Sequence, residues 1–249
     1  MYLSLEQFHI PDGVISVIGS GGKTTFLRLL AESLPGRVLL TTTTHIEPFP
    51  GIPLVESAAG ETEENLLDRL EAALKEARVV CLGTPMETGA DGGKKSGRPG
   101  PAPADPARGR IGKLSGPPVD PGVFSPLFDH ILVEADGSRR HPLKAHRPFE
   151  PVISPATSLT VCLAGLSGLG RRPEEVCHCP ELFCSITGSG LTDPVTAGHV
   201  ARVLGTEDLA DVYLLNQTDV LADPEAALDL CAAIKKPTLA GSLLKRTFL

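Results

Sequence analysis

A short glycine-rich segment carries the residues of this chain that are best suited to chemistry. Freed backbone N–H groups between glycines can point at one anion, and a following helix adds the partial positive charge of its N-terminus. Such a segment, where a strand turns into a helix, predicts a phosphate-binding loop for ATP or GTP. Its members are Gly19, Ser20, Gly21, Gly22, Lys23, Thr24 and Thr25.

Three side chains of this loop have predicted roles. Lys23 is expected to reach the terminal phosphates and neutralise charge, Thr24 to hold Mg²⁺ through its hydroxyl, and Thr25 to contact an inner phosphate. The loop is shorter than the common pattern, because only Ser20 and Gly21 separate Gly19 from Gly22. The alternative is an ordinary glycine turn with a chance Lys-Thr, but the strand-to-helix context favours phosphate binding.

Two acids follow a second buried strand, which is predicted over residues 131–133. Glu134 and Asp136 stand at its carboxyl end, where open α/β sheets bind their ligands, so we expect both to face the loop. Asp136 is predicted to hold Mg²⁺ together with Thr24, and Glu134 to orient the attacking water, although the two acids can exchange roles. The alternative is an Asp-Gly turn beside a surface glutamate.

Positive charge is concentrated directly after these acids, on a chain whose formal net charge is −7. We expect Arg139 and Lys144 to bind a second anionic substrate or a phosphate. The alternative is a solvated basic surface. The members of the cluster are Arg139, Arg140, His141, Lys144, His146 and Arg147.

A threonine-rich segment ends the strand predicted over residues 37–44. Thr43 and Thr44 are candidates for sensing the terminal phosphate, and His45 for reporting that state to a partner. The alternative is a strand end that is rich in β-branched residues for structural reasons only.

A second candidate nucleotide contact follows the strand predicted over residues 212–216. Asn216-Gln-Thr-Asp219 resembles the NKxD element of GTPases, in which the asparagine braces loops and the aspartate accepts a hydrogen bond from the base. Gln217 stands where that element has lysine, which leaves only a modest preference for guanine over adenine.

The elements that must position these residues alternate along the chain. Buried strands with helices between them predict an α/β fold with a doubly wound, mostly parallel sheet, a P-loop NTPase-like three-layer sandwich. The predicted strands cover residues 14–18, 37–44, 79–83, 131–133, 159–163, 212–216 and 238–244, and the predicted helices cover 26–34, 62–77, 192–204 and 224–234.

The length of 249 residues is consistent with one large α/β domain spanning residues 1–249. Within it, residues 86–110 are rich in Gly, Pro and Ala and have almost no large apolar residue. This composition predicts a disordered insert, and the alternative is a mobile lid that grasps an anion.

The overall totals exclude several classes of function. The acidic balance argues against a nucleic-acid partner, and no apolar run approaches the roughly 20 residues that span a membrane. The N-terminus lacks a secretion signal, and six cysteines without a CxxC pair fit a cytoplasmic protein. A metal site at Cys177, His178 and Cys179 is disfavoured because residues two apart do not share a helix face.

Four blocks together resemble one protein family in their order: GSGGKTT, TTTTHI, LVEADGSRRHPLKAH with EPVI, and LLNQTD. The chain is similar over nearly its whole length to YqeC-type selenium-dependent molybdenum hydroxylase accessory proteins. The resemblance implies a cytoplasmic, P-loop-type nucleotide hydrolase that uses Mg²⁺ and helps to mature a molybdenum enzyme with labile selenium. The hydroxylase or its cofactor would be the partner, and the insert at 86–110 departs from the family's shorter loop.

Two other functions remain open. The loop length, close to that of Mur-type ligases, and the basic cluster suggest an ATP-dependent ligase or kinase that acts on a small anionic substrate. Against it, we expect no room after the last strand for the substrate domain of such ligases. The third possibility is a non-catalytic nucleotide-binding module, which turnover of the bound triphosphate would distinguish from both enzymes.

Overall fold

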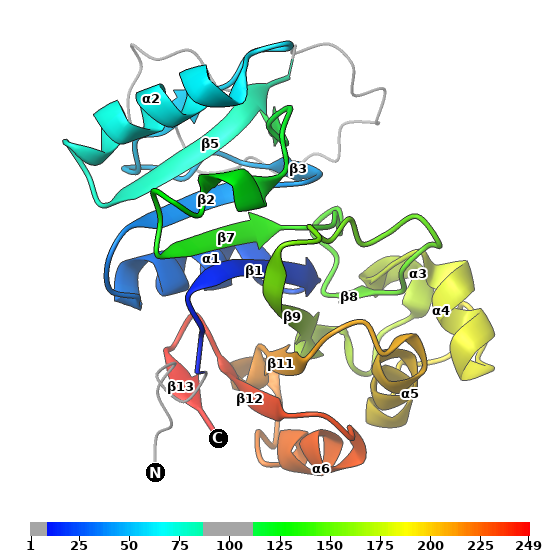
Figure 1. Cartoon of the computed structure of the whole chain (residues 1–249). Helices are drawn as coiled ribbons and strands as arrows, with labels where there is room; N and C mark the ends of the chain where they lie inside the picture. Colours follow the sequence, from blue (N-terminus) through cyan, green and yellow to red (C-terminus); the bar gives the residue numbers. More distant parts are fainter. Residues whose placement is uncertain (1–8, 87–111) are drawn as a thin grey trace.

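A mostly parallel sheet of 11 strands organises the chain in the computed structural model, which describes residues 9–86 and 112–249 (Figure 1). The insert predicted at 86–110 lies, apart from Met86, outside the described residues. The strands of this sheet are β1 (Gly13–Gly19), β2 (Val38–Thr42), β3 (His45–Ile46), β4 (Leu54–Glu56), β5 (Val79–Pro85), β6 (Leu114–Ser115), β7 (His130–Glu134), β9 (Thr157–Gly165), β11 (Val212–Asn216), β12 (Thr238–Ser242) and β13 (Thr247–Phe248).

The strand order is β13-β12-β11-β9-β1-β7-β2-β5-β6-β3, and β4 also pairs with β5, in parallel. The strands from β12 to β5 pair in parallel, and only β3, β6 and β13 join antiparallel. Runs of Val, Ile and Leu form the central strands because both faces of the sheet are covered. The predicted doubly wound α/β fold is therefore confirmed. Two short strands, β8 (Leu143–Lys144) and β10 (Cys177–His178), pair separately.

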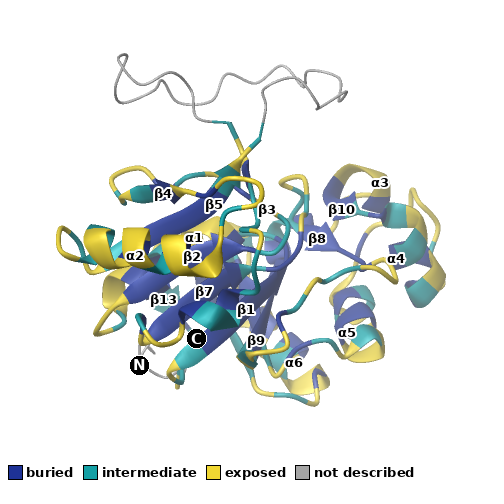
Figure 2. Cartoon of the chain, turned by 45° about the horizontal axis from the view of Figure 1, so that its top comes forward, coloured by how far each residue is buried: buried dark blue, intermediate teal, exposed yellow. Residues whose placement is uncertain are grey.

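Helices cover both faces of the sheet and make three layers. Ile15 and Val17 of β1 pack on one face with the apolar residues of the first helix, whereas Val14 and Ile18 point to the opposite face. Figure 2 shows the sheet as the buried centre between more exposed helices. The helices are α1 (Lys23–Ser33), α2 (Glu63–Leu74), α3 (Pro173–Val176), α4 (Pro180–Thr187), α5 (Ala197–Glu207) and α6 (Ala226–Ala233), with 3₁₀ turns η2 (Pro121–Phe124), η3 (Leu166–Gly168) and η4 (Thr218–Val220).

Two helix starts differ from the sequence-based prediction. Helix α1 begins at Lys23 rather than at residue 26, so the lysine and both threonines of the loop form its first turn. Helix α5 begins at Ala197 rather than at residue 192, because Thr196 caps it in a capping box with His199. Pro194 also biases the residue before it away from the helical region. His199 thus completes the cap of this helix.

The central strand β1 is the point where the strand order reverses. After β1 the chain adds β2, β5 and β7 on one side, and then β9, β11 and β12 on the other. Val17 of β1 and Thr42 of β2 both lie beside Glu134 of β7 in the register, so the carboxyl ends of these strands share one edge. Ligands of open α/β sheets bind at such a switch point.

Across the described ranges, we find no helix with the length and apolar character needed to cross a bilayer.

Candidate functional site

The phosphate-loop segment makes a turn of three residues between β1 and α1. Gly19, Gly21 and Gly22 have φ angles of 84°, 82° and 137°, which disfavour residues with a side chain. Space is also absent, since a Cβ at Gly21 would lie 2.4 Å from the Cα of Gly165 and one at Gly22 would lie 2.4 Å from Nδ2 of Asn216. The glycines are therefore required by the fold of the turn itself.

Asn216 braces this turn from the end of β11. Its Nδ2 donates to the carbonyl of Gly21 at 2.6 Å, and its Oδ1 accepts from the amide of Leu243 at 2.9 Å. The bracing expected for this asparagine is thus present in the geometry. The first N–H groups of a helix have no acceptor within the helix, and Thr24 and Thr25 in the first turn of α1 are exposed residues. The turn and the first turn of α1 together offer backbone donors to an anion.

Lys23 points back beneath the turn and meets both predicted acids. Its Nζ donates to the carbonyl of Gly19 at 2.6 Å and lies 2.8 Å from Oδ1 of Asp136 and 3.7 Å from Oε1 of Glu134. The lysine is buried, with 4% of its surface exposed. The structure therefore brings together the three residues that the sequence placed in one catalytic group.

Asp136 is fully enclosed and has a neighbour on each oxygen. Its Oδ2 accepts from the amide of Gly19 at 2.8 Å and from Nε2 of His146 at 2.8 Å, and it lies 3.1 Å from Nζ of Lys144. Burial opposes ionisation, but the charge of Lys23, the hydrogen bond from His146 and the charge of Lys144 together hold the pKa of this carboxyl well below its ordinary value. Asp136 is therefore a buried anion that binds both the amide of Gly19 and the ammonium of Lys23.

His146 extends this contact to helix α5. Its Nδ1 lies 2.7 Å from Oε2 of Glu207, the last residue of α5, whose Oε1 also accepts from the amide of His146 at 2.6 Å. Burial lowers the pKa of His146, but the hydrogen bonds to Asp136 and Glu207 outweigh it, and the pKa is raised. A carboxylate oxygen lies against each ring nitrogen, and this arrangement favours the protonated form of the imidazole, in which both nitrogens donate.

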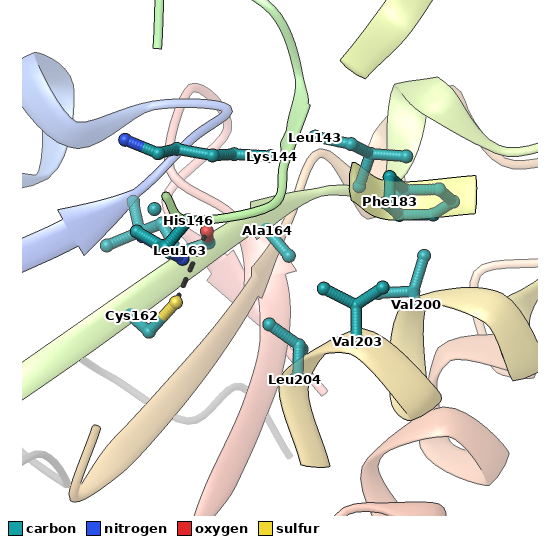
Figure 3. Close-up of a pocket in the computed structure, with 11 residues that line it drawn as sticks. Leu143, Lys144, His146, Cys162, Leu163, Ala164, Phe183, Val200, Val203 and Leu204 are labelled. Carbon is teal, nitrogen blue, oxygen red and sulfur yellow. Dashed lines mark hydrogen bonds between the residues drawn. The ribbon is translucent and has the colours of Figure 1, made fainter. Parts of the chain in front are cut away.

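Lys144 belongs to this buried network and not to a surface for anions. Its side chain is 1% exposed, donates to the carbonyl of Gly137 at 2.6 Å and lies 2.6 Å from Oε2 of Glu150. Its predicted role in binding a second ligand is corrected here, because its charge is already taken by carboxylates. Figure 3 shows Lys144 and His146 on one side of a water-sized cavity, with Phe183 of α4 and the apolar face of α5 on the other.

Glu134 is the acid that faces solvent. Its side chain is 12% exposed and lines a large cleft beside the turn. Burial, reinforced by the charges of Asp136 and Glu47 and opposed by Lys23, raises the pKa of Glu134 to about 7. A carboxyl that titrates near neutral pH can accept a proton from a bound water, which is the property required of a general base.

The cleft has a volume of about 1080 Å³ and collects most of the predicted site residues. Thr43, Thr44 and His45 line it, although the hydroxyl of Thr43 donates to the carbonyl of Val152 at 2.5 Å. Asp219 is exposed and does not line this cleft, so the structure leaves it outside the group. The remaining cleft residues from the predicted site are Gly21, Gly22, Lys23, Thr24, Thr25, Glu134 and Arg139.

The residues fit Mg²⁺ only in part. Thr24 is exposed and lines the cleft, and its hydroxyl is of a type that can ligate the ion. Asp136 does not fit a direct ligand in this arrangement, because its oxygens already face two ammonium groups, an imidazole nitrogen and an amide. Within the described ranges, no cluster of three or more His, Cys, Asp or Glu residues forms a metal centre, and this includes the segment around His178.

Sequence reasoning missed the contacts that run from Asp136 through His146 to Glu207. His146 was recognised as one member of a basic cluster, and Glu207 was not singled out. The two residues lie 61 positions apart, and their contact depends on how α5 packs against the sheet. A histidine ten residues after the aspartate was the one local signal available.

Comparison with known proteins gives one family and one curated relative. The family model described as "YqeC protein" matches residues 15–181. The relative is "Uncharacterized protein YqeC" of Escherichia coli (strain K12), which is 34% identical over 180 residues, covering 70% of this chain and 60% of that protein. The chain thus spans about 60% of the length of this relative. No solved structure matches.

Proposed function

Because the chain belongs to the YqeC protein family, we propose that it is a magnesium-dependent protein that binds and hydrolyses a nucleoside triphosphate, ATP or GTP. One observation carries the proposal. The ammonium of Lys23, the donors of a glycine turn and a cleft-facing carboxyl that titrates near neutral pH converge at the carboxyl end of the central strands. This set of groups suits phosphoryl transfer, in which positioning and charge stabilisation supply the catalysis.

The residues divide the work of hydrolysis among them. Amides of the turn and of the first turn of α1 receive the phosphates, and the triphosphate replaces the carbonyl of Gly19 as a partner of Lys23. Glu134 orients a water and takes its proton as the water oxygen bonds to the terminal phosphorus and the bond to the bridging oxygen breaks. Thr24 would hold Mg²⁺, which neutralises phosphate charge. Asp136 fixes Lys23 and the amide of Gly19.

The biological role that we propose is maturation of a selenium-dependent molybdenum hydroxylase, with the hydroxylase or its cofactor as partner. It rests on the resemblance of the GGKTT and EADGSRRHPLKA blocks to accessory proteins of that kind. Hydrolysis would supply a conformational step while the chain matures the target enzyme. A cytoplasmic location accords with this role.

A second candidate function is an ATP-dependent ligase or kinase that acts on a small anion. It is favoured by one observation, the presence of Arg139 and Arg147 in the same cleft as the glycine turn. A non-catalytic nucleotide-binding module is the third candidate, and it predicts binding without turnover.

Release of inorganic phosphate from Mg·ATP and Mg·GTP tests the proposal. We expect slow basal release by the parent chain and a loss of roughly 10²-fold or more in Glu134→Gln, the range typical of a general base. Exposed Glu64→Gln on α2 is the matched control and keeps the parent rate. No release by the parent, or equal release by Glu134→Gln, would contradict hydrolysis at this site.

A further inference from the structure

A group of cationic and imidazole side chains lines the same cleft as the glycine turn. We call Arg139, His141, Arg147 and His178 the cationic wall. Neither hydrolysis nor nucleotide binding as argued above uses any of them. They come from the segment after β7 and from β10, so the fold gathers residues from two parts of the chain.

The two arginines of the wall have no carboxylate partner, because the carboxylates near them pair with other cations. Glu47 lies 2.5 Å from Arg140, Glu150 lies 2.6 Å from Lys144, and Glu134 faces Lys23. Within the described ranges, neither Arg139 nor Arg147 has a carboxylate oxygen within 4.0 Å, and Arg147 instead lies over the ring of Phe149. Unpaired positive charge in a concave surface of an otherwise acidic chain attracts anions.

The segment that carries Arg139 is fixed to the glycine turn. The carbonyl of Pro142 accepts from the hydroxyl of Ser20 at 2.9 Å and from the amide of Gly165 at 2.8 Å. At its other end, the carbonyl of Gly137 accepts from the buried ammonium of Lys144 at 2.6 Å. The wall and the phosphate site are therefore parts of one preorganised surface, which reduces the entropy lost when a ligand binds.

His178 complements the arginines of the wall with an uncharged donor, and its ring lies beside that of His141. The two rings stack with centroids 6.5 Å apart. Burial, together with the nearby charges of Lys144, Arg139 and Arg147, lowers the pKa of His178 to about 4. At neutral pH its imidazole is uncharged and offers one N–H, so guanidinium groups supply the charge and imidazole adds a directional hydrogen bond.

We propose that the cationic wall binds the oxyanion group, a phosphate or a carboxylate, of a second small molecule while the glycine turn holds the nucleotide. This inference rests on the proposed function, because it assigns the second ligand of the same cleft. Planar guanidinium groups suit both anions through paired N–H donors. The cleft volume of about 1080 Å³ exceeds the usual 300–1,000 Å³ of a pocket for one drug-sized ligand.

Calorimetric titration of the full chain with inorganic phosphate, and separately with malonate, tests the wall. The chain is first saturated with Mg²⁺ and a non-hydrolysable analogue of ATP or of GTP, whichever binds, and ionic strength is held constant. We expect at least one of the two anions to bind, and Arg139→Ala/Arg147→Ala to weaken that binding by about tenfold or more, the loss of two charge-assisted contacts. The matched control is Arg171→Ala/Arg172→Ala, which removes two exposed charges near α3 that pair with Glu175 and Glu174.

The outcomes separate this inference from the proposed function. If the parent binds neither anion, or if the control double variant weakens binding as much as the wall variant, the wall is not an anion site. If the parent binds neither the ATP analogue nor the matching GTP analogue, the proposed function falls, and the same anion titrations on the nucleotide-free Lys23→Ala chain still decide the wall. In that chain, anion binding that is weakened when Arg139 and Arg147 are also replaced supports the wall. Anion binding that is absent, or that is unchanged by these replacements, overturns the wall.

Discussion

Replacing Asp136 with asparagine tests the buried network most severely. The substitution keeps the size of the side chain and removes one negative charge from a group that is 0% exposed. Lys23 at 2.8 Å, His146 at 2.8 Å and Lys144 at 3.1 Å then lose their shared counter-charge. The amide also cannot accept at both of its terminal atoms, so one neighbouring donor faces an N–H₂ group.

The expected loss of stability follows from the burial of these charges. Removing one partner of a buried ion pair costs about 3–5 kcal/mol, because the remaining charge is left without compensation. This cost is reduced because two of the cations keep another carboxylate: Lys144 still pairs with Glu150, and His146 still pairs with Glu207. We therefore expect the free energy of unfolding to fall by about 3 kcal/mol, which corresponds to roughly 6–12 °C in Tm for a chain of this size.

Urea denaturation of the parent and Asp136→Asn at pH 7 measures this difference. The control is Glu32→Gln, whose carboxylate pairs with Arg28 and Arg246 at the surface. Exposed pairs contribute about 0–1 kcal/mol, so the control should remain close to the parent. A loss below about 1 kcal/mol in Asp136→Asn would refute the view that this carboxylate holds the turn together.

Three further predictions concern the same cleft and network. Phosphate release by the parent should rise with pH through about 7, because Glu134 must be ionised to accept a proton, and a flat profile between pH 6 and 8 would argue against this base. Gly21→Ala should weaken Mg·ATP binding about tenfold or more by displacing the turn from the backbone of Gly165, whereas Gly205→Ala in open space on α5 should bind as the parent does, which calorimetry can compare. Because the pKa of His146 is raised in the folded chain, its contribution to stability is complete below about pH 6.5 and is lost as the pH rises through the pKa of the folded state. His146→Gln should therefore flatten the decline of the urea midpoint on the alkaline side. An unchanged decline would assign that decline to another group.

The sequence was sufficient to predict the sheet and the place of the turn. Runs of branched apolar residues marked the central strands, and glycines before Lys23 marked the strand-to-helix turn. Strand-end position alone indicated that Glu134 and Asp136 would meet the lysine, because parallel strands present their carboxyl ends at one edge.

The sequence was insufficient where charge is buried. Lys144 and Arg139 look alike in a basic cluster, but one is enclosed by carboxylates and the other is exposed in the cleft. Which of these two cations is neutralised depends on the position of Glu150 and of the strand β8, and the contact of His146 with Glu207 depends on tertiary packing. A pattern of neighbouring residues in the sequence does not show which side chains meet in the folded chain.

Calorimetric titration of the parent chain and Lys23→Ala with Mg·ATP, Mg·GTP and Mg·CTP tests the central claim most directly. The control Lys75→Ala removes an exposed lysine at the end of α2, and circular dichroism verifies that each variant is folded. We predict that the parent and the control bind at least one purine nucleoside triphosphate, and that folded Lys23→Ala binds none of the three. A folded Lys23→Ala chain that binds as tightly as the parent would contradict a phosphate site at the glycine turn.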